Sequence, residues 1–247
     1  MWEELDRLER VLSRFVETSD VARVAALSAG QSTTVGIELI DCLRTAGWAA
    51  RLSGGRFDVT YASRASGAAP ALLAVDEAAR RVTALRDGVR LDLGGVGKGY
   101  ALDRAAELLR DWGLRRFMLH AGQSTVLVAG DGAPWLVALR DPAPHGAALG
   151  QVRLAQGALA GSGRSLHGEH VRDAHTGEAP PAEIMATWAL APTAARADAL
   201  STALLLMTEA QVAAVATQAD LGGARLTAAA DGQHLETFGA LPAILSA

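Results

Sequence analysis

The sequence lacks several features, and each absence narrows what the protein can be. Cys42 is the only cysteine among 247 residues, so an internal disulfide is excluded and nothing indicates an oxidising compartment. No apolar run reaches the roughly 18 residues of a membrane-spanning helix, and the opening MWEELDRLERVL is charged and amphipathic. We therefore expect a soluble, cytoplasmic protein, although a start site chosen too far downstream would hide a signal peptide.

Lysine is almost missing, and acidic residues slightly outnumber basic ones. The formal net charge is -4, and Lys98 is the only lysine beside 22 arginines. No basic block stands out, which argues against nucleic acid as a partner. Half of the residues are hydrophobic, enough to bury a sizeable core in one large domain or two small ones.

Apolar spacing predicts helices and strands that do not alternate strictly. Helices are expected over residues 2–16, 33–50, 99–113, 194–207 and 209–218. Strands are expected at 71–75, 81–85, 89–93 and 185–191, in a strand-rich middle over 116–180, and in a final hairpin around Asp231-Gly232. Arg-Asp-Gly at 86–88 indicates a further hairpin turn. This pattern favours an α+β fold with mixed, largely antiparallel sheets over a doubly wound sheet.

The first candidate for chemistry is a glycine-rich loop that contains the single lysine. DLGGVGKGYALD, residues 92–103, runs from an expected strand into an expected helix. Glycines let backbone amides approach an anion, and a helix N-terminus favours negative charge, so the loop suits a phosphate. It differs from a Walker A loop because Gly99, not Ser or Thr, follows Lys98. The alternative is a tight strand-to-helix turn with an exposed lysine.

The second candidate is ADALSTAL, residues 197–204. Asp198 and Thr202 are four residues apart and stand on one face of the expected helix. A carboxylate and a hydroxyl are hard oxygen ligands that suit Mg²⁺, which prefers few protein ligands together with waters and phosphate oxygens. In the alternative interpretation, Asp198 is solvated and Thr202 bonds back to a helix carbonyl.

The third candidate is HGEHVRDAHTGEAP, residues 167–180, which begins with His167. It carries His170 and His175 near Asp173, and histidine suits general-base catalysis near neutral pH. A catalytic triad is not implied, because residues three apart on an extended chain point to opposite faces. A zinc site has little support without a nearby cysteine. The alternative is a polar turn.

Taken together, these segments resemble the ApbE-like family of FAD:protein FMN transferases over roughly residues 3–240. The glycine loop and ADALSTAL are the most specific matches, and SGGRFDVT at 53–60 and HVRDAHTG at 170–177 add to them. The resemblance implies an ApbE-like, T-fold-related single domain over residues 1–247. It also implies Mg²⁺-dependent cleavage of FAD, with FMN transferred to a threonine or serine of an acceptor flavoprotein and AMP released.

By this resemblance, the Mg²⁺ ligands are Asp198, Thr202 and a main-chain carbonyl, with Ala101 preferred and Gly97 as the second choice. The residues expected to contact FAD are Phe57, Asp58, Lys98 and Asp103. His170 is the expected base that takes the proton from the acceptor hydroxyl.

The chain also departs from the family pattern, mostly on the flavin side. Gln123-Ser124 stands where the family has a Gly-Gly-Asp aspartate, Asp173-Ala174 replaces Asp-Pro, and a Met-Gly-Thr strand has no counterpart in this sequence. Two further interpretations therefore stay open: a non-catalytic flavin-binding or scaffold relative, and a Mg²⁺-dependent FAD pyrophosphatase.

Overall fold

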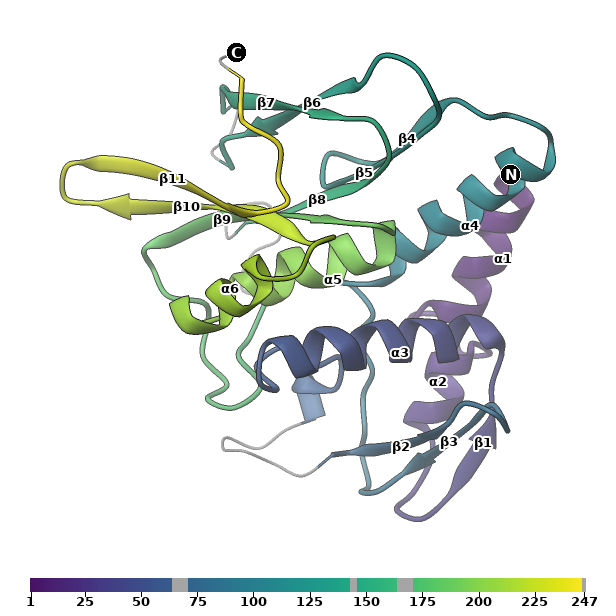
Figure 1. The fold of residues 1–247 in the computed structure, drawn as a ribbon. Helices are drawn as coiled ribbons and strands as arrows, with labels where there is room; N and C mark the ends of the chain where they lie inside the picture. The colour runs from purple at the N-terminus through teal and green to yellow at the C-terminus, as the bar shows by residue number, and fades with distance from the viewer. Residues whose placement is uncertain (64–70, 143–145, 164–170, 246–247) are drawn as a thin grey trace.

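A computed structural model of the chain describes residues 1–63, 71–142, 146–163 and 171–245 (Figure 1). Its main element is a six-stranded sheet in the order β11-β10-β9-β8-β5-β4, in which every neighbouring pair is antiparallel. The strands are β4 (Phe117–Ala121), β5 (Thr125–Ala129), β8 (Gly157–Gly163), β9 (Ile184–Ala191), β10 (Gly222–Ala229) and β11 (Gly232–Gly239).

Helices cover one face of this sheet and a hairpin covers the other. The helices on the sheet are α4 (Gly97–Asp111), α5 (Ala194–Leu204) and α6 (Glu209–Ala216), and α3 (Ile37–Leu52) packs against α5. The hairpin is formed by β6 (Trp135–Arg140) and β7 (Ala148–Leu154). Alternate residues of a strand point to opposite faces. Accordingly, Leu127 of β5 packs in the core on the helix side, and Val128 packs with β6 and β7.

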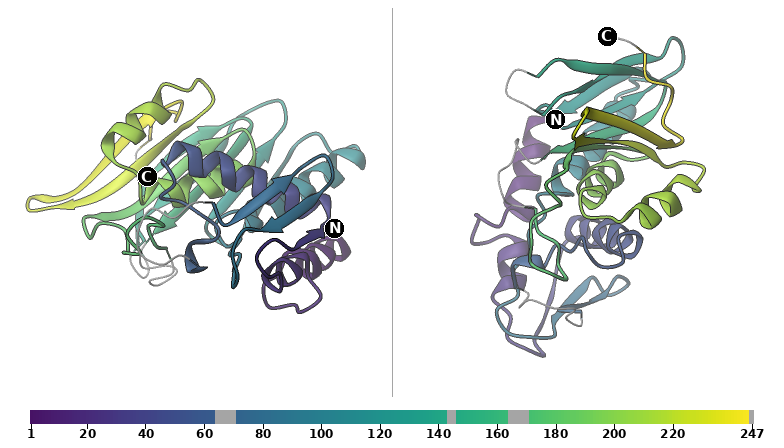
Figure 2. Two further views of the ribbon diagram at one scale, coloured as in Figure 1. Left: turned by 90° about the horizontal axis from the view of Figure 1, so that it is seen from below. Right: turned by 90° about the vertical axis from the view of Figure 1, so that its left-hand side faces the viewer.

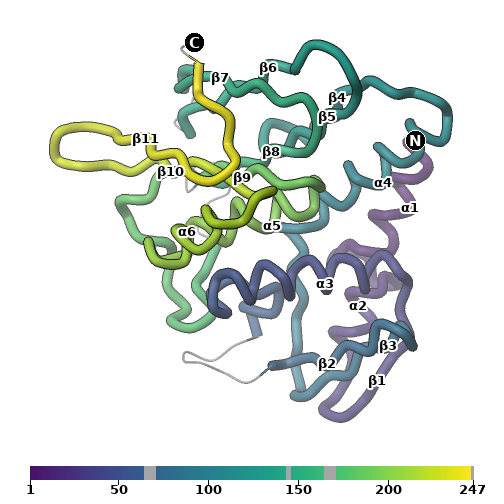
Figure 3. Tube along the Cα trace, in the orientation of Figure 1, coloured from purple at the N-terminus to yellow at the C-terminus, as the bar shows by residue number. Residues whose placement is uncertain are grey.

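A smaller unit lies beyond α3, formed largely by residues that precede the glycine loop (Figure 3). It contains a three-stranded antiparallel sheet in the order β1-β3-β2, with α2 beside it, whereas α1 packs against α3 and α4. The elements before the glycine loop, other than α3, are α1 (Trp2–Leu12), α2 (Asp20–Ala25), β1 (Ser32–Thr34), the 3₁₀ turn Tyr61–Ser63, β2 (Leu73–Asp76) and β3 (Arg81–Ala84). The hairpin of β10 and β11 projects from the opposite end of the molecule (Figure 2).

Helix α5 is the centre of the fold, and its composition explains why. Nine of its eleven residues are buried, most of them alanine or leucine. It packs against α3, α4, β8 and β9, and small side chains let these neighbours approach closely. A helix that is apolar nearly all round is normally an interior helix. A charged residue on its buried surface, Asp198, therefore needs polar partners.

The α+β fold with antiparallel sheets is confirmed, and so are the helices α5 and α6, strand β9 and the hairpin that turns at Asp231-Gly232. The expected strand 89–93 is wrong. Val89, Leu91 and Leu93 are buried in alternation, but none of the strands in the described part of the chain pairs with this segment. Alternating apolar residues predict that one face of a segment is buried, but they do not show that the segment pairs with another strand.

A turn does occur at Asp87-Gly88, where Gly88 has a φ of 69°, but no strand follows it, so the expectation of a hairpin at 86–88 is wrong. The hairpin of this region is instead formed by β2 and β3. Asp76 pairs with Arg81, and the Asp76 carboxylate accepts a hydrogen bond from Ala79 N at 2.9 Å. Such an aspartate turn is a recognised local signal.

Three further expectations need correction. The helix expected at 33–50 starts only at Ile37, because Ser32–Thr34 pair with β3 instead. The first helix ends at Leu12, and α2 was not expected. No strand occurs in the described part of 168–180, residues 171–180. Among the described residues, no helix is long and apolar enough to cross a membrane.

Candidate functional site

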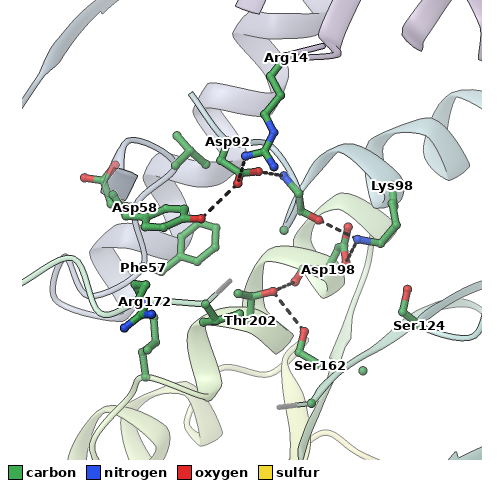
Figure 4. Close-up of a pocket in the computed structure, with 18 residues that line it drawn as sticks. Arg14, Phe57, Asp58, Asp92, Lys98, Ser124, Ser162, Arg172, Asp198 and Thr202 are labelled. Atoms are coloured by element: carbon green, nitrogen blue, oxygen red, sulfur yellow. Dashed lines mark hydrogen bonds and ion pairs between the residues drawn. The ribbon is translucent and has the colours of Figure 1, made fainter. Parts of the chain in front are cut away.

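Both specific sequence motifs line one cavity of about 260 Å³ (Figure 4). The loop that precedes α4 forms one side, α5 contributes Asp198 and Thr202, and the end of β8 contributes Ser162. The loop before the 3₁₀ turn adds Phe57 and Asp58. The fold therefore joins segments that are about 100 residues apart in the sequence.

Two glycines let the loop approach α5 this closely. A Cβ atom on Gly95 would lie 3.1 Å from Thr202 Oγ1 and 3.2 Å from Phe57 Cε2. A Cβ atom on Gly99 would lie 2.2 Å from the carbonyl oxygen of Ala194. A side chain at Gly99 would push α4 away from α5, so glycine is required there by close approach, whereas a side chain at Gly95 would require Thr202 and Phe57 to shift slightly.

The start of α4 points at a carboxylate. Gly99 N, in the first turn, donates a hydrogen bond to Asp198 Oδ2 at 3.1 Å. First-turn amides of a helix have no partner within the helix and favour negative charge. Gly97 N also has a partner, the Leu93 carbonyl oxygen at 2.7 Å, so this end of α4 favours an anion through the positive end of its dipole.

Lys98 lies in the cavity rather than pointing away from it, as Figure 4 shows. Its Nζ donates to the Gly94 carbonyl oxygen at 2.7 Å and lies 3.8 Å from Asp198 Oδ1, and 41% of its side chain is exposed. Lys98 is thus held beside the loop backbone with part of its ammonium group open to an anionic ligand.

The interpretation of Asp198 as a solvated residue is wrong, because only 2% of it is exposed. Besides Gly99 N and Lys98, it meets the Thr125 hydroxyl, which donates to Oδ1 at 3.4 Å. Thr202 does bond back to the helix, since its Oγ1 donates to the Asp198 carbonyl oxygen at 3.3 Å. The same Oγ1 lies 3.2 Å from Ser162 Oγ, so it also faces β8.

The donor set fits Mg²⁺ better than a metal that needs several carboxylates or imidazoles. The described residues hold no group of three or more His, Cys, Asp or Glu side chains that could bind a metal. One buried carboxylate and adjacent hydroxyls suit an ion that completes its shell with water and phosphate oxygens. Neither Ala101 nor Gly97 is among the described residues that line the cavity. The expected carbonyl ligand therefore stays a prediction.

The expected FAD-contacting residues do not all lie together. Phe57, Asp58 and Lys98 line the cavity, and Asp58 Oδ1 accepts hydrogen bonds from Thr60 N and Oγ1, both at 2.6 Å. Asp103 is not among the described lining residues. Its carboxylate accepts hydrogen bonds from the first backbone amides of α5, and burial raises its pKa to about 6 against the lowering effect of those bonds. A direct contact between Asp103 and FAD stays a prediction.

Sequence reasoning missed a polar group at the opposite wall of the cavity. Arg14 Nη1 forms an ion pair with Asp92 Oδ2 at 2.6 Å, and the Tyr61 hydroxyl donates to the same oxygen at 3.3 Å. Gly94 N donates to Asp92 Oδ1 at 2.9 Å. Asp92 belongs to the glycine motif, but Arg14 has no motif spacing that could have marked it.

The described part of the histidine motif packs against the loop that carries Phe57. Asp173 is buried and forms an ion pair with Arg56, and Ala174 N donates to the Arg56 carbonyl oxygen at 2.8 Å. Arg172 lines the cavity, and His175 is not among the described residues that do. His170, the expected base, and His167 lie outside the described residues.

A second cavity of about 1030 Å³ adjoins the first. It lies between the six-stranded sheet and the β6–β7 hairpin, and Ser124, Gly161, Ser162 and Gly163 line both cavities. Ser124 stands where the expected Gly-Gly-Asp aspartate is replaced.

Known proteins resemble this chain in sequence and in fold. The FAD:protein FMN transferase of Klebsiella pneumoniae (strain 342) is 32% identical over 128 residues, which are 47% of this chain and 37% of that protein. The Rhodobacter capsulatus FAD:protein FMN transferase is 32% identical over 173 residues, 66% of this chain and 32% of its own length. The chain thus spans well under two thirds of these curated relatives.

Two solved structures share the fold of this chain. Flavin Transferase ApbE from Vibrio cholerae superposes with a TM-score of 0.82 at 19% identity, covering 96% of this chain and 86% of that one. The apo form of Pseudomonas stutzeri flavinyl transferase ApbE gives a TM-score of 0.81 at 21% identity, covering 96% and 84%. The model of the ApbE family matches residues 1–224, and this chain therefore belongs to the ApbE family.

Proposed function

We propose that this protein transfers FMN from FAD to a threonine or serine hydroxyl of an acceptor flavoprotein, releases AMP, and requires Mg²⁺. The observation that carries the proposal is the meeting of Asp198 and Thr202 with the N-terminus of α4 and Lys98 in one cavity. The names of the relatives, FAD:protein FMN transferase, support the same reaction.

The residues of the cavity suit a diphosphate. The partly exposed Lys98 ammonium and the positive N-terminal end of the α4 dipole offer positive charge to its oxygens. Asp198 and Thr202 would hold Mg²⁺ against the same phosphates. When bound, the ion neutralises phosphate charge and orients the leaving group. Phosphoryl transfer depends mainly on such positioning and electrostatics, so no covalent intermediate with the protein is needed.

The proposed step forms one bond, breaks one bond and transfers one proton. The acceptor hydroxyl oxygen bonds to the FMN phosphorus, the bond from that phosphorus to the bridging oxygen breaks, and AMP leaves with the bridging oxygen. The hydroxyl proton has to go to a base, and His170 is the residue we propose for it. Imidazole can accept a proton near neutral pH.

The test incubates the purified protein with FAD and Mg²⁺, with and without an acceptor flavoprotein domain that carries a Thr or Ser site. AMP is followed by chromatography, and the protein gel is read for covalent flavin fluorescence. We expect AMP and a fluorescent acceptor band, both lost with EDTA. AMP with free FMN and an unlabelled acceptor would indicate a Mg²⁺-dependent FAD pyrophosphatase. FAD binding without AMP would indicate a non-catalytic relative.

A further inference from the structure

Helices α4 and α5 each place an aspartate carboxylate at the N-terminus of the other helix. Asp198 of α5 accepts a hydrogen bond from Gly99 N in the first turn of α4. In return, Asp103 of α4 accepts from Ala194 N at 2.8 Å through Oδ1 and from Ala195 N at 2.9 Å through Oδ2. First-turn amides lack partners within their own helix, and some of those of each helix are satisfied here by a side chain of the other helix.

The hydrogen bond of Asp198 depends on those of Asp103, because both sets join the same faces of α4 and α5. Gly99 and Asp103 are one turn apart and share a face of α4, and Ala194, Ala195 and Asp198 share a face of α5 in the same way. The helices already touch there, since a Cβ on Gly99 would lie 2.2 Å from the Ala194 carbonyl oxygen. A shift of the start of α5 along or away from α4 therefore displaces Asp198 from Gly99 N.

We infer that Asp103 is a positioning residue for the proposed metal site, holding the start of α5 so that Asp198 stays in register with the glycine loop. The carboxylate acts through α5, because Asp103 is not among the described residues that line the cavity. The catalytic consequence of this role rests on the proposed function, whereas the positioning itself is a property of the two helices.

Thr193 provides a matched control for simple helix capping. Its side chain accepts a hydrogen bond from Arg196 N at 3.3 Å, so it also satisfies a first-turn amide of α5. Thr193 lies on the same helix start and makes no contact with α4 through this bond. Thr193→Ala removes a cap, and Asp103→Ala removes the link between the two helices. Asp103→Asn changes the shape little, but it keeps only one acceptor oxygen and sets an NH2 donor against the second amide.

The experiment compares Asp103→Asn, Asp103→Ala, Asp103→Glu and Thr193→Ala with the unaltered protein. Amide-proton exchange at Gly99 is measured by NMR without metal or FAD, and the Mg²⁺ concentration for half-maximal AMP release is measured with FAD. We expect the Asn and Ala variants to speed Gly99 exchange at least about tenfold. They should also raise the half-saturating Mg²⁺ concentration about tenfold, with a smaller change in KM for FAD.

Asp103→Glu keeps the carboxylate and should recover part of both effects. Thr193→Ala should lower the urea midpoint without changing either readout. If the Asp103 variants match Thr193→Ala in both, the residue is only a cap and the inference is overturned. If the unaltered protein releases no AMP, the proposed function fails, and Gly99 exchange still decides whether Asp103 positions α5. Urea midpoints of all variants show which of them remain folded.

Discussion

Gly99→Ala is the change that tests the helix contact behind the site most directly. The new Cβ would lie 2.2 Å from the Ala194 carbonyl oxygen and 2.7 Å from Ala195 Cα, whereas real Cβ atoms essentially never come within 3.0 Å. Both obstacles are backbone, so α4 and α5 have to separate by about 0.8 Å. The bond from Gly99 N to Asp198 Oδ2 would then lengthen from 3.1 Å to nearly 4 Å.

The cost follows from these distances. Overpacking a close contact costs about 1–3 kcal/mol, and a lost hydrogen bond to a buried charged group costs about 1.5–3 kcal/mol. Replacing glycine by alanine within a helix stabilises the helix by up to about 1 kcal/mol. We therefore expect Gly99→Ala to lower the free energy of unfolding by about 2–4 kcal/mol and to reduce AMP release with it.

Gly97→Ala is the matched control, two residues earlier in the same turn. Its Cβ would meet only Leu93 Cβ, at an ordinary 3.8 Å, so it should be neutral or stabilise by up to about 1 kcal/mol. Urea-induced unfolding of both variants gives the difference. Equal stability of the two variants, within about 0.5 kcal/mol, would refute the close α4–α5 contact as the reason for Gly99.

Four further predictions concern single side chains. Asp198→Asn should cut Mg²⁺-dependent AMP release about 100-fold or more while the fold persists, because a metal ligand contributes several kcal/mol; unchanged turnover would exclude the metal assignment. Lys98→Arg should raise KM for FAD or lower kcat about tenfold, since a planar fork replaces a compact ammonium; wild-type kinetics would make Lys98 a solvated residue. Arg14→Met should raise KM for FAD about tenfold, because Asp92 loses its ion-pair partner, and should lower the free energy of unfolding by less than about 1 kcal/mol. A larger loss of stability would mean that the pair is structural. Cys42 is fully buried and burial raises its pKa, so a thiol reagent should label it only at the rate of unfolding; prompt labelling of the native protein would contradict this packing.

The elements that sequence reasoning placed well carry their own local signals. Asp231-Gly232 marks the β10–β11 turn, and Thr208 with Gln211 forms a capping box at the start of α6. Local chemistry decides such boundaries, so no knowledge of the fold is needed. Residues 89–93 show the opposite case, because whether an extended segment becomes a strand depends on a partner strand elsewhere in the chain.

In the candidate site, too, the sequence predicts some residues and not others. The spacing of Asp198 and Thr202 puts them on one face of a helix in any fold, and the structure keeps them there. Membership of a motif does not say which way a residue faces. Lys98 and Asp103 belong to one glycine motif, yet Lys98 lines the cavity and Asp103 contacts α5. Arg14 joins the site only through tertiary packing, and no local pattern could have assigned it.

The charges of the cavity bear on the need for a divalent cation. Among the described lining residues, Arg14, Lys98 and Arg172 carry positive charge and Asp58, Asp92 and Asp198 carry negative charge, so the wall is close to neutral. The diphosphate of FAD, the proposed substrate, would add two negative charges, and uncompensated charge beside buried groups is costly. Lys98 cannot neutralise them alone, because it also faces Asp198 at 3.8 Å. A divalent cation beside Asp198 would balance the diphosphate and release Lys98 to contact it, which is why we place Mg²⁺ and the lone lysine on the same phosphates.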